Sequence, residues 1–297
     1  MKYLKYSFLI AVAACLTSCG ESTNVAEVDI QIDTLTLNRH MEVLASDDFM
    51  GRKPFTEGED KTIHYLESEL KAMGVSPGNG DSYFQEVPLV EITGTQSEEM
   101  IIKGEGATLR FDTGEDEEVY TERVEEEVGI EDSELVYAGY GIVAPEYGWN
   151  DYEGLDVSGK TVVVLVNDPG FSSGDSTFFK GKEMTYYGRW TYKYEEAARQ
   201  GAAGVLIVHE TVPAGYPWLV VQSSWTGAKL NLDAENPPYR CAIQGWITRN
   251  TAVELFRTAG ITDYSGKAKS KDFKPIPMGL TATVSIQNQI KKDVSRN

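Results

Sequence analysis

The chain has 297 residues, with 46 acidic residues against 27 basic ones and a formal net charge of −19 at pH 7. A surface of this sign repels phosphate backbones and no basic tract offsets it, so nucleic acid is excluded as a partner. A hydrophobic content of 41% is enough for a packed core, which excludes a largely disordered chain. The length allows one large domain or two smaller ones.

The first residues predict export. Lys2 and Lys5 precede an apolar stretch, residues 8–16, that is too short to span a bilayer, and this is the pattern of a signal peptide. The stretch runs into Leu-Thr-Ser-Cys19, which resembles the lipobox of bacterial lipoproteins, where the peptide is removed before a cysteine that is then acylated. An ordinary signal peptide followed by a chance cysteine is the alternative.

The expected product is a lipoprotein anchored to a membrane in the periplasm or at the cell surface. Residues 1–18 would be the signal peptide, Cys19 would carry the lipid, and the polar residues 19–34 would be a tether. Cys15 would leave with the signal peptide, so the mature chain would keep Cys241 without an intramolecular partner. We therefore expect the fold to depend on core packing and not on disulfides.

Helices are predicted after the tether. Leu37, Met41 and Leu44 share one helical stripe. Thr56 and Glu59 have the spacing of a capping box, and the helix that they open carries a second stripe that ends at a glycine. The members of this second stripe are Ile63, Leu66, Leu70 and Met73, with Gly74 after them.

A β-rich region with interspersed helices follows. Strands are predicted over residues 83–90, 135–139, 161–166, 205–208, 242–247 and 280–290. Residues 190–200 form a helical pattern, and a second helix is expected after residue 248, with Thr248 as its N-cap. Twelve acidic residues and one basic residue lie between Asp112 and Glu134, so this segment carries more than half of the net charge. A solvated excursion between strands is the favoured interpretation, over a calcium site or a partner surface.

Two glycine-rich stretches imitate nucleotide-binding motifs. Residues 154–161 match the phosphate-loop pattern, but a β-branched run follows the Gly-Lys-Thr where a helix would be required. Residues 139–144 imitate a dinucleotide fingerprint, but Pro145 stands where its helix must begin. A nucleotide site is therefore disfavoured.

No catalytic or metal-binding residue is assigned. His209-Glu210 begins like a zinc-protease helix, yet Pro213 occupies the place of the second histidine. His64 and Glu67 suggest the inverse motif, but Ser68 interrupts it. There is no Gly-x-Ser-x-Gly elbow, so machinery for nucleophilic catalysis is not visible either.

Several stretches, taken in order, resemble a known family. Residues 40–47, Gly51-Arg52 and the helix from residue 57 to 74 resemble the opening of bacterial two-zinc aminopeptidases, which are related to glutamate carboxypeptidase II and the transferrin receptor. Residues 137–141, 156–164 and 197–208 resemble the protease-associated (PA) domain that these enzymes carry as an insertion.

The resemblance implies an α+β chain in which a β-rich PA domain, an open barrel or sandwich with flanking helices, is inserted into an incomplete α/β zinc-peptidase domain. The implied boundaries are residues 35–96 for the N-terminal part of the peptidase domain, 97–278 for the PA domain and 279–297 for a returning strand that is cut short. The full-length family binds two zinc ions and removes N-terminal residues from peptide or protein substrates. The first His-x-Asp ligand stretch follows the returning strand in the family, so no ligand and no general base transfers to this chain.

The resemblance thus implies the N-terminal portion of an exported aminopeptidase that is inactive alone, without bound metal. A stand-alone PA lipoprotein that acts as a binding module is the alternative. Trp218 and Trp225 lie in an aromatic loop-like segment that could cap the substrate cleft of the parent enzyme; local packing of a long loop is the competing interpretation. Nothing in the pattern specifies an oligomeric state.

Overall fold

A computed structural model describes residues 31–104, 106–234 and 238–296. The chain divides into two compact units, residues 1–64 and 65–297, and each is described by itself. The predicted signal peptide, the lipidation site Cys19 and all but the last residues of the tether lie outside the described residues. Within the described ranges, no helix is both long enough and apolar enough to cross a membrane.

The smaller unit contains α2 (Thr34–Leu44), η1 (Asp47–Arg52) and the start of α3 (Glu57–Ala72), which runs across the division. The carboxylate of Asp33 caps α2 by accepting the backbone N–H groups of Leu35 and Thr36. The predicted apolar stripe forms, but it is not covered: α2 has no buried residue, and Leu37 and Met41 remain 51% and 60% exposed.

Ten strands of the described residues form one sheet in the larger unit. The strand order is β10-β1-β12-β5-β8-β9-β11-β4, and a β2–β3 hairpin pairs with β12. The strands are β1 (Glu86–Gln96), β2 (Glu99–Gly104), β3 (Ala107–Asp112), β4 (Glu117–Tyr120), β5 (Glu127–Tyr137), β8 (Thr161–Leu165), β9 (Gly204–Val208), β10 (Ala228–Leu232), β11 (Ile243–Ile247) and β12 (Ile276–Arg296). A separate pair consists of β6 (Val143–Ala144) and β7 (Trp149–Asn150).

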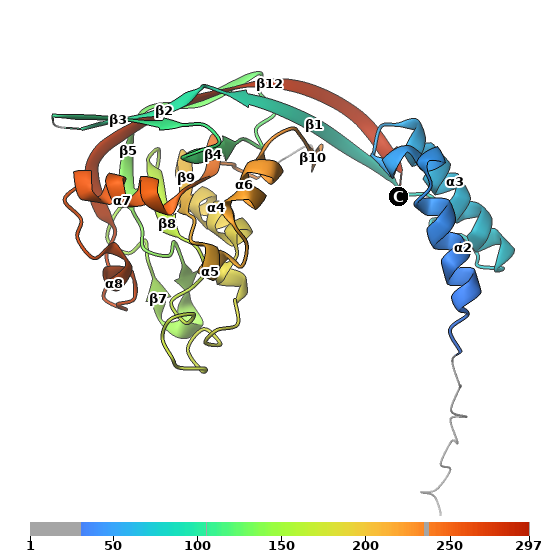
Figure 1. Cartoon of the computed structure of the whole chain (residues 1–297), viewed down its shortest axis with the longest axis horizontal. Helices are drawn as coiled ribbons and strands as arrows, with labels where there is room; N and C mark the ends of the chain where they lie inside the picture. Colours follow the sequence, from blue (N-terminus) through green and yellow to red (C-terminus); the bar gives the residue numbers. More distant parts are fainter. Residues whose placement is uncertain (1–30, 105, 235–237, 297) are drawn as a thin grey trace, which may run out of the picture. The chain divides into compact units, whose positions relative to one another are not determined.

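Helices cover both faces of the central strands. Strands β5, β8, β9 and β11 run parallel, and the mainly apolar, fully buried β8 and β9 are typical of strands covered on both sides. Val162 and Val164 belong to a core shared with α4 and α6, whereas Val163 and Leu165 belong to a core shared with α7. Figure 1 shows these helices beside the central strands. The helices are α4 (Trp190–Arg199), α5 (Thr211–Ala214), α6 (Trp218–Trp225), α7 (Arg249–Thr258) and α8 (Tyr264–Ala268), with short 3₁₀ turns η2 (Pro145–Tyr147) and η3 (Tyr186–Gly188).

Strands β1 and β12 form a stem, and β1 also pairs with β10 on its other side. The two stem strands pair antiparallel over eleven positions, from Glu86 opposite Arg296 to Gln96 opposite Ile286. The chain leaves the stem after Gln96 and returns to it at Ile286, with β2 to β11 in between. Because Gln96 and Ile286 are paired, the points of exit and return lie side by side. The alternation predicted for residues 280–290 is observed: Leu280, Ala282 and Val284 are all buried.

A side chain connects the stem to the far edge of the sheet. The amide oxygen of Gln96 accepts the backbone N–H of Val119 at 3.0 Å, and its nitrogen donates to the Glu117 carboxylate at 2.7 Å. The sheet is curled so that β4 contacts the end of β1, and the sheet as a whole resembles a nearly closed barrel. This arrangement confirms a mixed α+β fold with a barrel-like sheet and flanking helices.

Two parts of the structure differ from the expectation. The acidic segment is not only a solvated excursion, because it supplies β4 and most of β5, and Glu117 and Glu118 are buried there. The loop expected around Trp218 is largely the helix α6, which begins after Pro217. Its sequence opens with a continuous apolar run and has no capping side chain, so it lacks the helical period; the helix is held by tertiary contacts of Val221 and Trp225.

Candidate functional site

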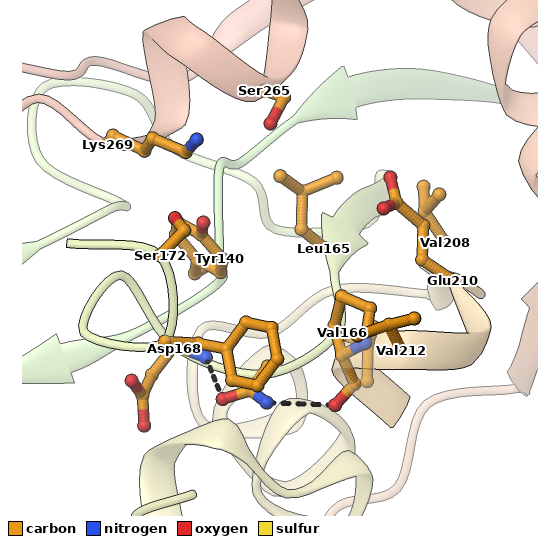
Figure 2. A pocket seen from close by; sticks show the side chains of 13 residues that line it. Tyr140, Leu165, Val166, Asp168, Ser172, Val208, Glu210, Val212, Ser265 and Lys269 are labelled. Carbon is orange, nitrogen blue, oxygen red and sulfur yellow. Dashed lines mark hydrogen bonds between the residues drawn. The ribbon is translucent and has the colours of Figure 1, made fainter. Parts of the chain in front are cut away.

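The ends of the parallel strands enclose a cavity. Ligands of open α/β sheets ordinarily bind beyond the carboxyl ends of the strands. Here a cavity of about 290 Å³ lies where β8 and β9 end, and we call it the strand-end cavity. Its wall includes Tyr140, Leu165, Ser172, Val208, Glu210 and Lys269 (Figure 2).

The loop after β8 is fixed by Asn167. This residue has φ +69°, a left-handed conformation that asparagine tolerates better than most residues. Its side-chain oxygen accepts the backbone N–H of Asp168 at 2.8 Å, and its nitrogen donates to the carbonyl of Pro213 in α5 at 2.8 Å. Asn167 therefore ties the ends of β8 and β9 together at the base of the cavity.

Buried charges support this loop from below. The ammonium of Lys193 in α4 donates to the carbonyls of Asn167 and Tyr187 at 2.9 and 2.7 Å. Burial lowers the pKa of Lys193, whereas the nearby carboxylates of Asp151 and Asp168 oppose that shift. The Asp168 carboxylate accepts the N–H of Gly170 and both the N–H and the hydroxyl of Thr185, so its oxygens are already engaged.

Tyr140 is positioned by a turn that Asp151 holds. The Asp151 carboxylate is buried and accepts the backbone N–H groups of Tyr140 and Ile142 at 3.1 and 3.0 Å. At Gly141, φ is +64°, and a Cβ would approach the side chain of Val164 to 2.7 Å, so glycine is required there. Burial raises the pKa of Tyr140 to about 12, so its hydroxyl stays protonated at neutral pH.

Two opposite charges face the strand-end cavity. Glu210 precedes α5, directly after β9, and Lys269 follows α8. Figure 2 shows the carboxylate and the ammonium entering the cavity from different sides. Among the described residues, neither group has a hydrogen-bond or ion-pair partner.

A second, more open cavity lies beside the first. It has a volume of about 500 Å³, contains Asp116, His209, Trp218 and Arg249, and shares Glu210 with the strand-end cavity. His209 is only 4% exposed, and its Nε2 hydrogen-bonds to the carbonyl of Tyr216 at 3.1 Å. Burial lowers the pKa of His209, so the ring is neutral at pH 7 and has a structural place between aromatic rings.

A third hollow occupies the opposite, amino-terminal edge of the parallel strands. Its wall includes Asp132, Ser158 and Lys160. Lys160 pairs with Glu134, and Asp132 pairs with Lys103, so the one lysine of this hollow is already engaged. The strand-end cavity is therefore the better candidate site.

The sequence-predicted positions are dispersed. His64 lies on the exposed face of α3, and His209 is buried directly after β9. Over the described ranges, no three His, Cys, Asp or Glu side chains are grouped so as to hold a metal ion, and the residues present therefore do not fit a zinc site. Cys241 is buried and free, and burial raises the pKa of its thiol to about 12.

The two tryptophans with a predicted capping role both belong to α6. The indole N–H of Trp218 donates to the carbonyl of Gly114 at 2.9 Å, and Trp218 lines the second cavity. The ring of Trp225 packs edge-on against Trp190 and Tyr120, at 5.1 and 5.7 Å between ring centroids. Their role as a cap over a substrate cleft stays a prediction.

The phosphate-loop match is correctly rejected. Residues 154–161 form turns that lead into β8, and no helix follows them. The N–H of Gly159 donates to the carbonyl of Gly201 at 2.9 Å, so that group is not free to bind a phosphate. The glycine-rich residues 139–144 are likewise followed by the 3₁₀ turn η2 and not by an α-helix.

Sequence reasoning missed Asn167, Glu210 and Lys269. A signal was present for the first two, because each lies at most two residues beyond the end of a strand that is apolar throughout. Polar residues at that position are candidates for a site at the carboxyl edge of a sheet. Lys269 had no such signal, because its helix α8 has only five residues and no apolar period.

Comparison with known proteins identifies no family. No protein-family profile matches the sequence, and neither does any curated protein. A structure similar in part is that of BSAP, a zinc aminopeptidase from Bacillus subtilis, with 12% sequence identity and a TM-score of 0.30. The similarity covers 90% of this chain and 47% of that protein, so the chain spans about half of its length. A resemblance at this level does not establish a shared fold.

Proposed function

We propose that the chain is the N-terminal, PA-containing portion of an exported zinc-dependent aminopeptidase, and that this portion binds peptide without hydrolysing it. The observation that carries the proposal is the stem of β1 and β12. The chain from β2 to β11 follows β1 and leads back into β12, and these two strands are paired. An inserted domain needs its entry and exit side by side, and the stem supplies this geometry. The stem strand β1 ends at Gln96, where the PA insertion of the proposed arrangement begins.

The helices before the stem also support the proposal. Leu37 and Met41 in α2, and Leu66 and Met73 in or just after α3, are between 45% and 63% exposed. An apolar helix stripe is ordinarily covered by a sheet or another helix. In the proposed arrangement, the peptidase sheet covers these stripes, and protein outside the described residues supplies the zinc ligands.

The alternative is a stand-alone PA lipoprotein that acts as a binding module. One observation favours it: the larger unit has cores on both faces of its sheet and so does not need a further domain to bury them. The coding sequence downstream distinguishes the two functions. His-x-Asp and Glu-Glu motifs in the same frame support the peptidase portion, whereas an unrelated gene supports the stand-alone module.

Hydrolysis and binding can be measured on the same sample. The purified chain is assayed with aminoacyl nitroanilides and added zinc, with and without a chelator, and separately titrated into a fluorescently labelled unstructured peptide whose ends are blocked. We expect no chelator-sensitive turnover and a saturable rise in anisotropy. Chelator-sensitive turnover would show that the chain itself is a metallopeptidase, and a flat anisotropy curve would remove the binding role.

A further inference from the structure

We propose that the strand-end cavity binds a free zwitterion of the size of an amino acid or a dipeptide, with the ligand ammonium at Glu210 and the ligand carboxylate at Lys269. This inference rests on the proposed function, because it specifies the products or ends of peptides as the ligand class. The observations that carry it are the two opposite charges, the hydroxyl groups in the same cavity and the apolar floor.

The two opposite charges of the cavity indicate a ligand that carries both a positive and a negative group. Glu210 and Lys269 lie on separate elements, and no ion pair joins them. A ligand with a single charge would leave one of the two groups without a partner at the cavity. A ligand with one charge of each sign pairs with both, and charge-assisted hydrogen bonds are about twice as strong as neutral ones. An anion alone is further disfavoured by the net charge of −19.

Hydroxyl groups line the same cavity as the two charges. Tyr140, Ser172 and Ser265 all belong to the cavity wall, and Figure 2 shows Tyr140 and Ser172 on the side of Lys269. Ser265 is placed on α8, the helix that Lys269 follows. Hydroxyls both donate and accept, so they can bind a carboxylate oxygen or a peptide N–H without adding charge. The carboxylate of Asp168 does not compete for the ligand ammonium, because its oxygens accept hydrogen bonds from Gly170 and Thr185.

The remaining surface is apolar. Leu165 and Val208, at the ends of β8 and β9, form the floor, and Val212 and Phe171 extend it. An aliphatic side chain of the ligand would lie on this surface and contribute about 25 cal/mol per Å² of buried area. The volume of about 290 Å³ is at the lower limit of small-molecule pockets, which span about 300–1,000 Å³. The cavity therefore suits a leucine or a small dipeptide better than a long peptide.

The test compares four small ligands by titration calorimetry on the full chain. Leucine carries both charges, N-acetyl-leucine lacks the ammonium, leucinamide lacks the carboxylate, and the dipeptide Leu-Leu separates the charges. We expect leucine or Leu-Leu to bind, and each capped leucine to bind at least about tenfold more weakly, because about 1.4 kcal/mol is lost with one charged contact. If N-acetyl-leucine and leucinamide bind as tightly as leucine and Leu-Leu, the proposal is wrong.

Two variants assign the charges to their ends. Glu210→Gln should weaken leucine and leucinamide but leave the residual binding of N-acetyl-leucine unchanged. Lys269→Met should weaken leucine and N-acetyl-leucine but leave leucinamide unchanged. The matched controls are Glu254→Gln on α7 and Lys267→Met on α8, which remove the same charges outside the cavity and should change nothing.

The outcomes separate this inference from the proposed function. Binding of the blocked, labelled peptide is measured on the wild type and on the two cavity variants and their two controls. Circular dichroism first shows that each protein is folded. If the blocked peptide binds while leucine and Leu-Leu do not, the peptide-binding role stands and the zwitterion site is wrong. If the small zwitterions bind and the blocked peptide does not, the cavity is assigned and the peptide-binding role is wrong. If nothing binds, both are wrong.

Discussion

Glu117 is a buried carboxyl group that should make the free energy of unfolding depend on pH. Its side chain is fully buried beside the curl of the sheet, where one oxygen accepts from Gln96 and Thr113 and the other has no hydrogen-bond partner among the residues that the structure describes. Burial raises the pKa of Glu117 to about 8. The side chain is therefore largely protonated at pH 7, and the fold accommodates a neutral acid at the point where β4 meets β1.

The sign of the pH effect follows from this raised pKa. Between the unfolded value of about 4.3 and the folded value of about 8, the folded state holds the proton more tightly, so stability falls as the pH rises. Glu117→Gln removes the titration. We expect the variant to exceed the wild type by at least about 1 kcal/mol in free energy of unfolding at pH 8.5, and to approach it at pH 5.

Urea denaturation at both pH values measures this difference. The control is Glu115→Gln, which removes a charge from the same segment at an exposed position and should leave the pH dependence unchanged. An equal pH slope for Glu117→Gln and the wild type would mean that Glu117 is ionised in the folded protein, contrary to its burial.

Single residues also show where sequence reasoning is limited. Glu210 stands out in the sequence because it follows a histidine, yet the feature that matters is its place at the end of a buried strand. His209 beside it is a core residue. Glu210 and Lys269 are brought to one cavity by tertiary structure alone, so their presence in the same cavity could not be predicted from a local pattern.

Helices α2 and α7 share an amphipathic pattern but differ in burial. Leu255 of α7 is 1% exposed in a packed core, whereas Leu37 of α2 is 51% exposed. Leu255→Ala should therefore lower the free energy of unfolding by about 2–5 kcal/mol, through lost burial and a residual cavity. Leu37→Ala should change it by less than about 0.5 kcal/mol, as surface substitutions usually do.

The matched pair is measured by thermal and urea denaturation of the full chain. A large loss for Leu37→Ala would mean that α2 already has a partner that covers its stripe, and it would remove one support for the proposed peptidase portion. A loss for Leu255→Ala below about 1 kcal/mol would contradict the packing of α7 against the sheet.

Elements with a clear period could be predicted from the sequence, and elements held by tertiary contacts could not. The helix over residues 190–200 and the N-cap Thr248 are confirmed, because the apolar spacing of the first and the capping side chain of the second are local signals. The helix α6 and the β2–β3 hairpin have no comparable local signal. The pairing of β1 with β12 joins residues about 190 to 210 positions apart, and no local pattern specifies such a partner.

At the scale of the whole molecule, the sheet and its stem place the candidate site. The parallel strands end at one edge, where two cavities share Glu210, and the third hollow lies at the other edge. The residues that form the carboxyl edge belong to the part of the chain between β1 and β12. We therefore assign ligand binding to the carboxyl edge and not to the amino edge.

Backbone amide chemical-shift mapping by NMR, during titration of the full chain with Leu-Leu, tests this assignment most directly. We expect saturable shifts around Tyr140, Asn167, Glu210 and Lys269, and unchanged resonances around Asp132 and Lys160 at the opposite edge. Shifts confined to the amino edge, or no saturable shift at millimolar ligand, would show that the carboxyl edge of the parallel strands is not the binding site.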